Sequence, residues 1–283
     1  MNCTLNKEPV NKVRELRDRL IKNLVILKII GFIWMFLPTF LRIRLPICGQ
    51  AVGFRFNRNF KVQKFYWQLH PGELIGRKYF KGSFRSYEPS TQKYIFSYLS
   101  NNFKNKRVVF LNVGANVGFW SVRLNLDFPL ITHLLVEPLP KNISLLEENL
   151  RSNKIIDYKL YPYALGNGVG FHKMYVNKSL LGTSSLIFET DNYEVIQMRK
   201  GDNLIREFVN LILIDVEGYE IETIKGMRNL ILRSRPTIIC EASLETLPVL
   251  SKIMEELGYK KPIKLGKGKV FSAQEKNFLF ISN

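Results

Sequence analysis

The stretch VVFLNVGANVG, residues 108–118, decides the fold. Its first six residues are mostly β-branched or apolar, which predicts a short buried strand at 108–113. Gly114 and Gly118 predict a tight turn, because glycine has no Cβ, and a helix is expected from Phe119. A helix that begins after such a turn directs free N–H groups toward a ligand, as at the carboxyl ends of parallel strands that hold nucleotide-type cofactors. A glycine turn between a strand and a helix also occurs in ordinary loops. Other stretches of the sequence are therefore needed to decide whether this turn binds a cofactor.

Two later stretches favour a cofactor site. An apolar run at 131–136 ends in Glu137, and an acid about 20 residues beyond the glycine turn is typical of a group that holds a ribose diol. Residues 211–220, LILIDVEGYE, predict another buried strand with carboxylates crowded at its end. A nicotinamide fingerprint is excluded, because no register of G-x-G-x-x-G through Gly114 places glycine at the other two positions, and no phosphate loop is present.

Strands and helices alternate from residue 107 onward. Strands are expected at 108–113, 131–137, 159–165, 211–216, 236–241 and 277–281, and helices at 91–99, from 119, at 140–150, 220–232 and 244–257. Residues 169–200 are expected to be less regular. This alternation predicts an α/β fold with a mostly parallel sheet and helices on both faces.

Five motifs occur in the order seen in FkbM-type methyltransferases: NVGANVG at 112–118, EP at 137–138, ALG at 164–166, GTSSL at 182–186 and IDVEGYE at 214–220. The chain resembles that family over residues 75–245. The resemblance implies a Rossmann-like class I methyltransferase fold with a seven-stranded sheet, and methyl transfer from S-adenosylmethionine, usually to a hydroxyl oxygen. Asn112 stands where the family usually has Asp, and an asparagine keeps an acceptor oxygen but loses the charge. Leu213 stands where the family often has Lys.

The resemblance also implies a set of site residues. The expected cofactor-binding residues are Asn112, Gly114, Ala115, Asn116 and Gly118 along the methionine part, Glu137 on the ribose, Ala164 and Leu165 near adenine, and Asp215. Methyl transfer needs alignment and removal of the acceptor's proton, so a carboxylate near the methyl group is the expected catalytic group. Asp215 is the first candidate, followed by Glu217 and Glu241. The alternative for each is an ordinary turn carboxylate or one that is favoured near a helix start by the helix dipole. Ser184, Ser185 and His172 are the expected acceptor-binding residues.

No metal site is predicted. Asp215, Glu217 and Glu241 offer oxygen ligands of the kind that Mg²⁺ takes, but the sequence does not show that they cluster. The histidines show no ligand spacing, and His133, inside a strand, is expected to be structural. The three cysteines form no metal or disulfide spacing and suggest a reducing compartment, such as the cytoplasm.

The net charge of +18 is concentrated in the first third of the chain. Residues 1–110 hold 21 basic and 5 acidic residues, whereas residues 111–283 hold 21 and 19. We therefore expect three parts: a basic segment at 1–50, an accessory lead-in at 51–106 and the methyltransferase domain at 107–283. Residues 24–41 form an apolar run interrupted by Lys28 and Pro38, slightly short of the ~20 residues of a bilayer span. Three alternatives remain open: a helix packed on the domain, a surface-lying or re-entrant membrane anchor, and a true span.

Three functions are compatible with these features. The first is O-methylation of a glycan, a lipid-linked sugar or another hydroxylated small molecule. The second is nucleic-acid methylation, suggested by the charge, but the D-V-E-G sequence at 215–218 differs from the Asn/Asp-Pro-Pro-aromatic motif of base-methylating enzymes, and its acids would repel phosphate. The third is a non-catalytic relative that has lost the cofactor, suggested by Asn112 and Leu213. The sequence does not identify the acceptor.

Overall fold

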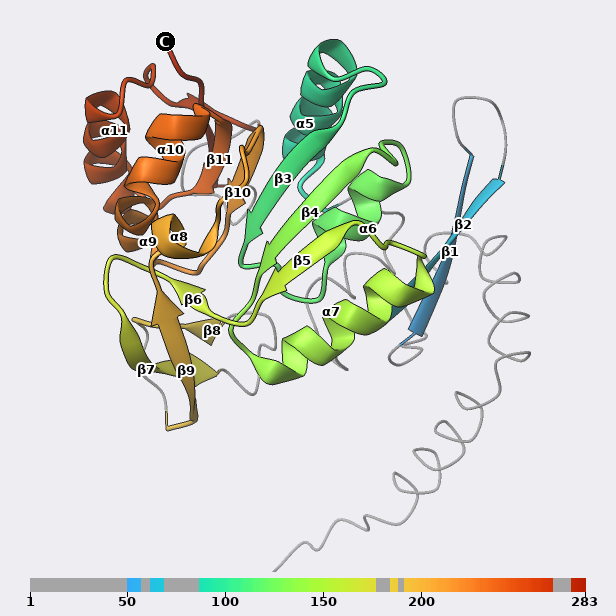
Figure 1. The fold of residues 1–283 in the computed structure, drawn as a ribbon, viewed down its shortest axis with the longest axis horizontal. Coiled ribbons are helices and arrows are strands. Elements are labelled where there is room, and N and C mark those ends of the chain that lie inside the picture. Colours follow the sequence, from blue (N-terminus) through green and yellow to red (C-terminus); the bar gives the residue numbers. More distant parts are fainter. Residues whose placement is uncertain (1–49, 57–61, 69–86, 177–183, 188–190, 267–275) are drawn as a thin grey trace, which may run out of the picture.

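The computed structural model describes residues 50–56, 62–68, 87–176, 184–187, 191–266 and 276–283 (Figure 1). The apolar run at 24–41, His70, and Gly182 and Thr183 of the GTSSL motif lie outside the described residues. Among the residues that are described, none of the helices is long and apolar enough to cross a membrane.

A seven-stranded sheet forms the centre of the molecule, in the order β12-β13-β11-β10-β3-β4-β5. Its strands are β3 (Val108–Val113), β4 (Ile131–Val136), β5 (Tyr158–Tyr161), β10 (Leu211–Ile214), β11 (Thr237–Glu241), β12 (Ile263–Lys264) and β13 (Asn277–Phe280). The five strands β5, β4, β3, β10 and β11 are neighbours in this order and pair in parallel. The strand β13 runs antiparallel to both β11 and β12. The expected mostly parallel seven-stranded sheet is therefore confirmed.

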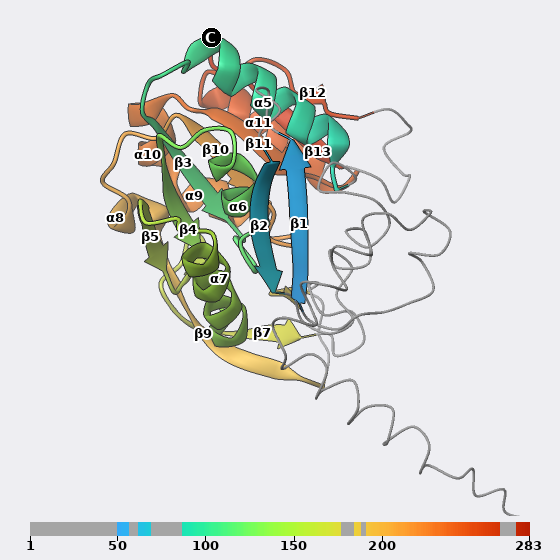
Figure 2. The same ribbon diagram turned by 90° about the vertical axis from the view of Figure 1, so that its right-hand side faces the viewer.

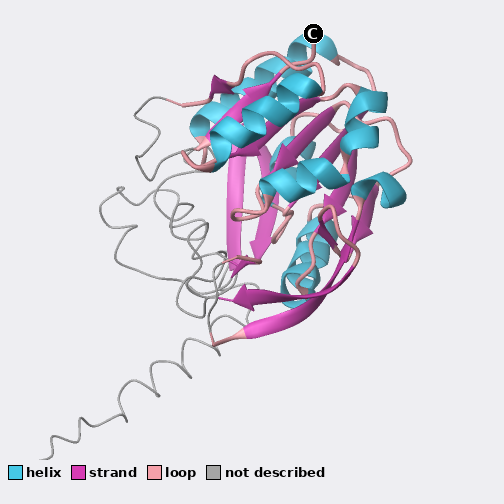
Figure 3. Cartoon of the chain, turned by 90° about the vertical axis from the view of Figure 1, so that its left-hand side faces the viewer, coloured by secondary structure: helices cyan, strands magenta, loops and turns pink. Residues whose placement is uncertain are grey.

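Helices cover both faces of this sheet, as Figure 3 shows. One face carries α5 (Pro89–Asn102), α6 (Phe119–Asn125) and α7 (Pro140–Ser152), and the other carries α8 (Gly201–Leu204), α9 (Glu220–Gly226), α10 (Arg228–Ser234) and α11 (Thr246–Glu256). Alternate strand residues divide between the two layers: Phe110 and Leu213 face the first group of helices, and Leu111 and Ile214 face the second. Burial on both faces explains why these strands read as nearly continuous apolar runs.

The helix α5 belongs to the main core. Ile95 and Leu99 of α5 are completely buried in the same apolar cluster as Phe110 and Leu213. The hairpin of β1 (Gln50–Phe56) and β2 (Val62–Gln68) is antiparallel, and β2 lies beside α7 (Figure 2). The segment expected as an accessory lead-in thus contains a helix that helps to build the central core.

Three local predictions were wrong. The strand expected at 159–165 is divided into β5 and β6 (Ala164–Leu165), which belong to different sheets, because Pro162 between them has no N–H to pair. The segment expected to be irregular forms β7 (Gly170–Val176), β8 (Ser184–Ser185) and β9 (Tyr193–Arg199), which build a second sheet in the order β6-β9-β7-β8. The helix expected at 220–232 is broken at Met227, whose buried side chain packs closely on Gly201.

Candidate functional site

One row of residues crosses the central sheet at the carboxyl ends of its parallel strands. Extending the strand registers by one residue places Gly114 beside Asp215, and Asp215 beside Glu241. Glu241 in turn pairs with Asn277 of β13. The preceding row on the same face is formed by Asn112, Leu213, Ile239 and Leu279, three of which are apolar. The polar groups of the site therefore follow a mostly apolar row, in which Asn112 is the polar member.

The glycine turn lies directly against the end of β10. Gly114 has φ +83°, and a Cβ atom added there would lie 1.9 Å from the carbonyl oxygen of Asp215. The N–H groups of Gly114 and Ala115 both donate to the carbonyl of Val136, at 3.0 and 2.9 Å. Gly118 has φ +89°, and its added Cβ would lie 2.5 Å from Cδ1 of Leu146 in α7. Only glycine fits at position 114 without displacing backbone, so this turn is built for close approach.

Glu137 ties this turn to the start of α7. Its Oε2 accepts a hydrogen bond from the N–H of Asn116 at 2.9 Å. Its Oε1 accepts from the N–H of Leu139 and from Nδ2 of Asn142, both at 3.1 Å. Burial raises the pKa of Glu137 to about 7, and these three hydrogen bonds oppose the rise. The side chain thus holds Asn116 in its left-handed conformation, φ 48°. The ribose contact expected of Glu137 stays a prediction.

The residues around the turn fit a polar cofactor. Asn112 is only 1% exposed, yet neither atom of its amide group has a hydrogen-bond partner among the described residues. The side-chain oxygen of Asn116 is likewise without a partner in the described part of the chain. Unpartnered buried polar groups are costly, and a ligand that pairs with them removes the cost. Asn112, Asn116 and the Gly114 turn therefore fit a polar ligand, and S-adenosylmethionine is the ligand expected from the sequence.

Five carboxyl groups interact around the ends of β10 and β11: those of Glu88, Asp215, Glu217, Glu220 and Glu241. Loss of water contact raises the pKa of Asp215 well above its usual value, and Glu241, Glu88 and Glu217 raise it further; Asp215 also shares a hydrogen bond with Glu241. Burial and the charges of Glu241 and Glu220 raise the pKa of Glu217 to about 7. The structure thus brings Asp215, Glu217 and Glu241 together, which the sequence alone did not show, and it does so as interacting carboxyl groups.

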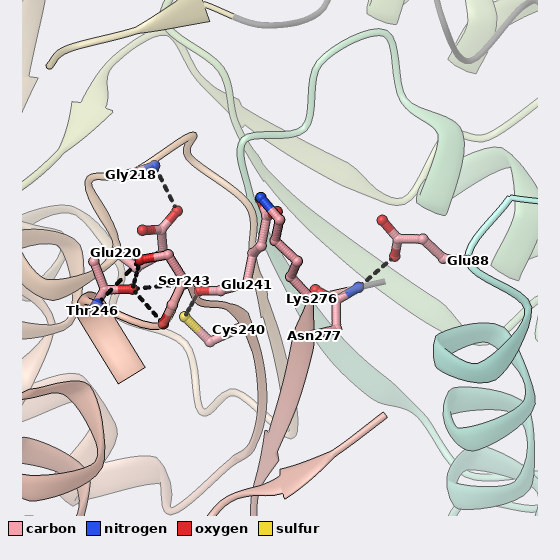
Figure 4. A network of polar contacts seen from close by, with 9 residues as sticks. All are labelled: Glu88, Gly218, Glu220, Cys240, Glu241, Ser243, Thr246, Lys276 and Asn277. Atoms are coloured by element: carbon pink, nitrogen blue, oxygen red, sulfur yellow. Dashed lines mark hydrogen bonds and ion pairs between the residues drawn. The ribbon is translucent and has the colours of Figure 1, made fainter. Parts of the chain in front are cut away.

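Sequence analysis missed Glu88 and Asn277. Nδ2 of Asn277 donates to Oε2 of Glu88 at 2.7 Å and to Oγ1 of Thr91 at 3.1 Å. Figure 4 shows this contact beside Glu241 and Lys276, whose ammonium group lies 3.9 Å from Oε1 of Glu241. Tyr87, the residue before Glu88, packs on Phe119 with ring centroids 4.7 Å apart. The available signal was GSFRSYEP at 82–89, which resembles a segment that precedes the fold in the family and was expected to cover the cofactor or to meet the acceptor.

The predicted adenine and acceptor residues lie on the second sheet. Ala164 and Leu165 are buried in β6, and Oγ1 of Thr223 donates to the carbonyl of Leu165 at 3.0 Å. Ser185 is 5% exposed and donates from Oγ to the carbonyl of Glu217 at 2.9 Å, so the second sheet covers the D-V-E-G turn. Ser184 and His172 are partly buried in β8 and β7. Ser185 uses its hydroxyl to hold the turn in place. Of the predicted acceptor-binding residues, Ser184 and His172 are therefore the better candidates.

The described residues contain no group of three histidine, cysteine or acidic side chains arranged to hold a metal ion. Among these residues the carboxyl groups instead pair with each other, with backbone N–H groups and with Lys276. Gly218, for example, donates its N–H to Oε1 of Glu220 at 3.0 Å.

The sheet order, the antiparallel β13 and the glycine turn after β3 define a Rossmann-like methyltransferase fold. The family model described as the methyltransferase FkbM domain matches residues 112–261. The chain therefore belongs to the FkbM methyltransferase family, a family of transferases.

Several solved methyltransferases resemble the structure at low sequence identity. The FkbM methyltransferase of Methylobacillus flagellatus KT is 15% identical with a TM-score of 0.47, and the match covers 73% of this chain and 52% of that one. An rRNA methylase from Streptococcus thermophilus is 10% identical with a TM-score of 0.37, covering 62% of this chain and 84% of that one. The bifunctional kinase-methyltransferase WbdD is 13% identical with a TM-score of 0.44, covering 69% and 39%. The match thus spans about half the length of the Methylobacillus protein, and no curated protein matches this sequence.

Proposed function

We propose that the protein transfers a methyl group from S-adenosylmethionine to a hydroxyl oxygen of a glycan, a lipid-linked sugar or another small molecule. The cofactor supplies a methyl group on a positively charged sulfur, so that the C–S bond breaks as the O–C bond forms and the sulfur keeps the electron pair. The residues must hold the hydroxyl in line with that bond and take its proton.

The observation that carries this proposal is the contact between the glycine turn and Asp215. A Cβ atom at Gly114 would lie 1.9 Å from the backbone carbonyl oxygen of Asp215, so a ligand bound along residues 114–118 would lie near the end of β10. The raised pKa of Asp215 makes its carboxylate a better proton acceptor than an ordinary surface aspartate. Glu241, on the neighbouring strand β11, shares a hydrogen bond with Asp215 and so helps to hold the proton that Asp215 accepts.

A lipid-linked acceptor is attractive because of the first third of the chain. Residues 24–41 are apolar and are flanked by basic residues on both sides, a composition suited to an anionic membrane surface. Under this proposal the chemistry takes place in the cytoplasm, where the acceptor is presented at the membrane. Nucleic acid is the less favoured acceptor, since Glu88, Asp215 and Glu241 would repel a phosphate brought close to the turn.

Calorimetry with S-adenosylhomocysteine tests cofactor use, and transfer of labelled methyl groups to a panel of sugars and lipid-linked sugars tests the reaction. Asp215→Asn should bind S-adenosylhomocysteine like the wild type but lose about 100-fold or more in turnover, because the proton acceptor is gone. Glu256→Gln on the exposed end of α11 is the matched charge control. Absence of binding by the wild type would refute the proposal, and turnover within a few-fold in Asp215→Asn would remove the role of Asp215.

A gel-shift series on mixed RNA at rising salt separates the alternative acceptor. A nucleic-acid enzyme shows tight binding at low salt that weakens steeply as salt rises. Specific RNA binding that persists at physiological salt would favour the nucleic-acid function over the proposed one.

A further inference from the structure

Glu88 joins the site from a distant part of the sequence. It lies immediately before α5, and its backbone adopts a left-handed conformation with φ 41° and ψ 60°, which is uncommon for a glutamate. Its carbonyl accepts the N–H of Gln92 at 2.9 Å, and its carboxylate accepts Nδ2 of Asn277 at 2.7 Å. Asn277 is itself only 4% exposed, so both partners are held in place. The position of the Glu88 carboxylate is therefore fixed by the fold.

Glu88 adds negative charge to a place that already holds the carboxyl groups of Asp215, Glu217 and Glu241. The charges of Glu88 and Glu241 both act on Asp215, and both act on the hydroxyl of Tyr87 as well. The ammonium group of Lys276 lies 3.9 Å from Oε1 of Glu241, and its side chain is 45% exposed. Charges in partly dehydrated surroundings interact more strongly than charges in water, so this arrangement favours a ligand that brings a positive charge.

A second observation points to a ligand at the same edge. The buried amide of Asn112, without a partner among the described residues, lies on the same face of the sheet, one row below Gly114 and one strand from Asp215. A molecule that satisfies Asn112 and follows the glycine turn also meets the field of Asp215, Glu241 and Glu88. The acidic groups are thus part of the surroundings of that molecule.

We propose that Glu88, together with Asp215 and Glu241, makes the site selective for the positively charged sulfonium of S-adenosylmethionine over the neutral thioether of S-adenosylhomocysteine. This inference rests on the proposed function. Glu88 acts as a positioning residue. Asn277 holds its carboxylate near Glu241 and Asp215, and its negative charge adds to theirs. After methyl transfer the sulfur of the product is neutral, so the site's electrostatic attraction for it, and hence its affinity, is lower.

The test is a comparison of dissociation constants by calorimetry at pH 8 for S-adenosylmethionine, S-adenosylhomocysteine and sinefungin, in which a protonated amine replaces the sulfonium. We expect the wild type to bind the two cations about tenfold more tightly than S-adenosylhomocysteine. Glu88→Gln retains an oxygen that accepts from Asn277, so the fold should remain intact. This variant should lose about three- to tenfold in affinity for both cations and keep its affinity for S-adenosylhomocysteine within about twofold.

Glu256→Gln removes one negative charge far from the site and should leave all three dissociation constants unchanged. Raising the salt concentration should reduce the selectivity, because added ions screen partly exposed charges. Equal affinity of the wild type for the three ligands, or an equal loss for all three in Glu88→Gln, would overturn the inference while the proposed function stands. If none of the three ligands binds to the wild type, the proposed function fails and takes this inference with it.

Discussion

Replacing Gly114 by alanine tests the close approach on which the site is built. At φ +83°, an alanine pays roughly 1–2 kcal/mol for the left-handed conformation. Its Cβ would also lie 1.9 Å from the carbonyl oxygen of Asp215, a backbone atom that moves only if the end of β10 moves. Displacing packed backbone costs roughly 1–3 kcal/mol, and the lower entropy of the unfolded alanine chain offsets roughly 0.4–1 kcal/mol. We expect Gly114→Ala to lower the free energy of unfolding by about 3 kcal/mol.

Urea denaturation and S-adenosylhomocysteine calorimetry measure the two consequences. Gly168→Ala is the matched control, since its added Cβ would have Sδ of Met198 at 3.9 Å as its nearest neighbour and so makes only ordinary contact. The control should stay within about 0.5 kcal/mol of the wild type and bind normally. Gly114→Ala should bind S-adenosylhomocysteine at least about tenfold more weakly, because the turn and Asp215 move apart. Wild-type stability and binding in Gly114→Ala would show that the turn does not approach β10 as described.

Three further substitutions test single groups. Asn112→Leu removes a buried unpartnered amide, so it should raise the free energy of unfolding by roughly 1 kcal/mol while weakening S-adenosylhomocysteine binding; a less stable variant would contradict this. Glu137 has a pKa raised to about 7, so the folded state holds its proton more tightly than the unfolded state. Stability should therefore fall as pH rises from about 4.5 to 7, by at most roughly 1.4 kcal/mol per pH unit, and urea curves of Glu137→Gln should lack that component. Burial lowers the pKa of His133 to about 4, so stability should fall as pH drops from about 6.5 to 4 in the wild type, and His133→Leu should lose less over that range.

The central sheet was predictable because its strands are buried on both faces. The predicted strands at 108–113, 131–137, 211–216, 236–241 and 277–281 agree with β3, β4, β10, β11 and β13 within two residues at either end. Continuous apolar runs bounded by turn residues identify such strands without knowledge of their partners.

The second sheet was missed because its strands depend on partners far away in the chain. β8 has two residues, and β6 has two that pair in parallel with Met198 and Arg199 of β9. Strands this short carry too few residues for an alternating pattern to be recognised. In β9 the alternation is present, since Ile196 and Met198 are buried while Val195 is 63% exposed, but it was not interpreted as a strand.

The site was predictable only where it coincides with the ends of strands. Asp215 and Glu241 follow apolar runs, and the parallel arrangement of those runs places them together. Glu88 reaches the same place through Asn277, which lies 189 positions away in sequence, and no local pattern reports such a contact. Its left-handed backbone is likewise invisible in the sequence.

The geometry also ranks the carboxyl groups as proton acceptors. Asp215 continues β10 in register, on the face shared by Asn112, and its N–H donates to the carbonyl of Val113 at 3.0 Å. Glu217 leaves this register, because its backbone turns to φ 52° and its carbonyl is held by Ser185. Its carboxyl group interacts with those of Glu241 and Glu220 and with Lys276, and its charge acts on Asp215 in turn. Because a strand keeps one residue in two on each face, Asp215 is the carboxyl group that we expect to meet the ligand, and Glu217 is the weaker candidate.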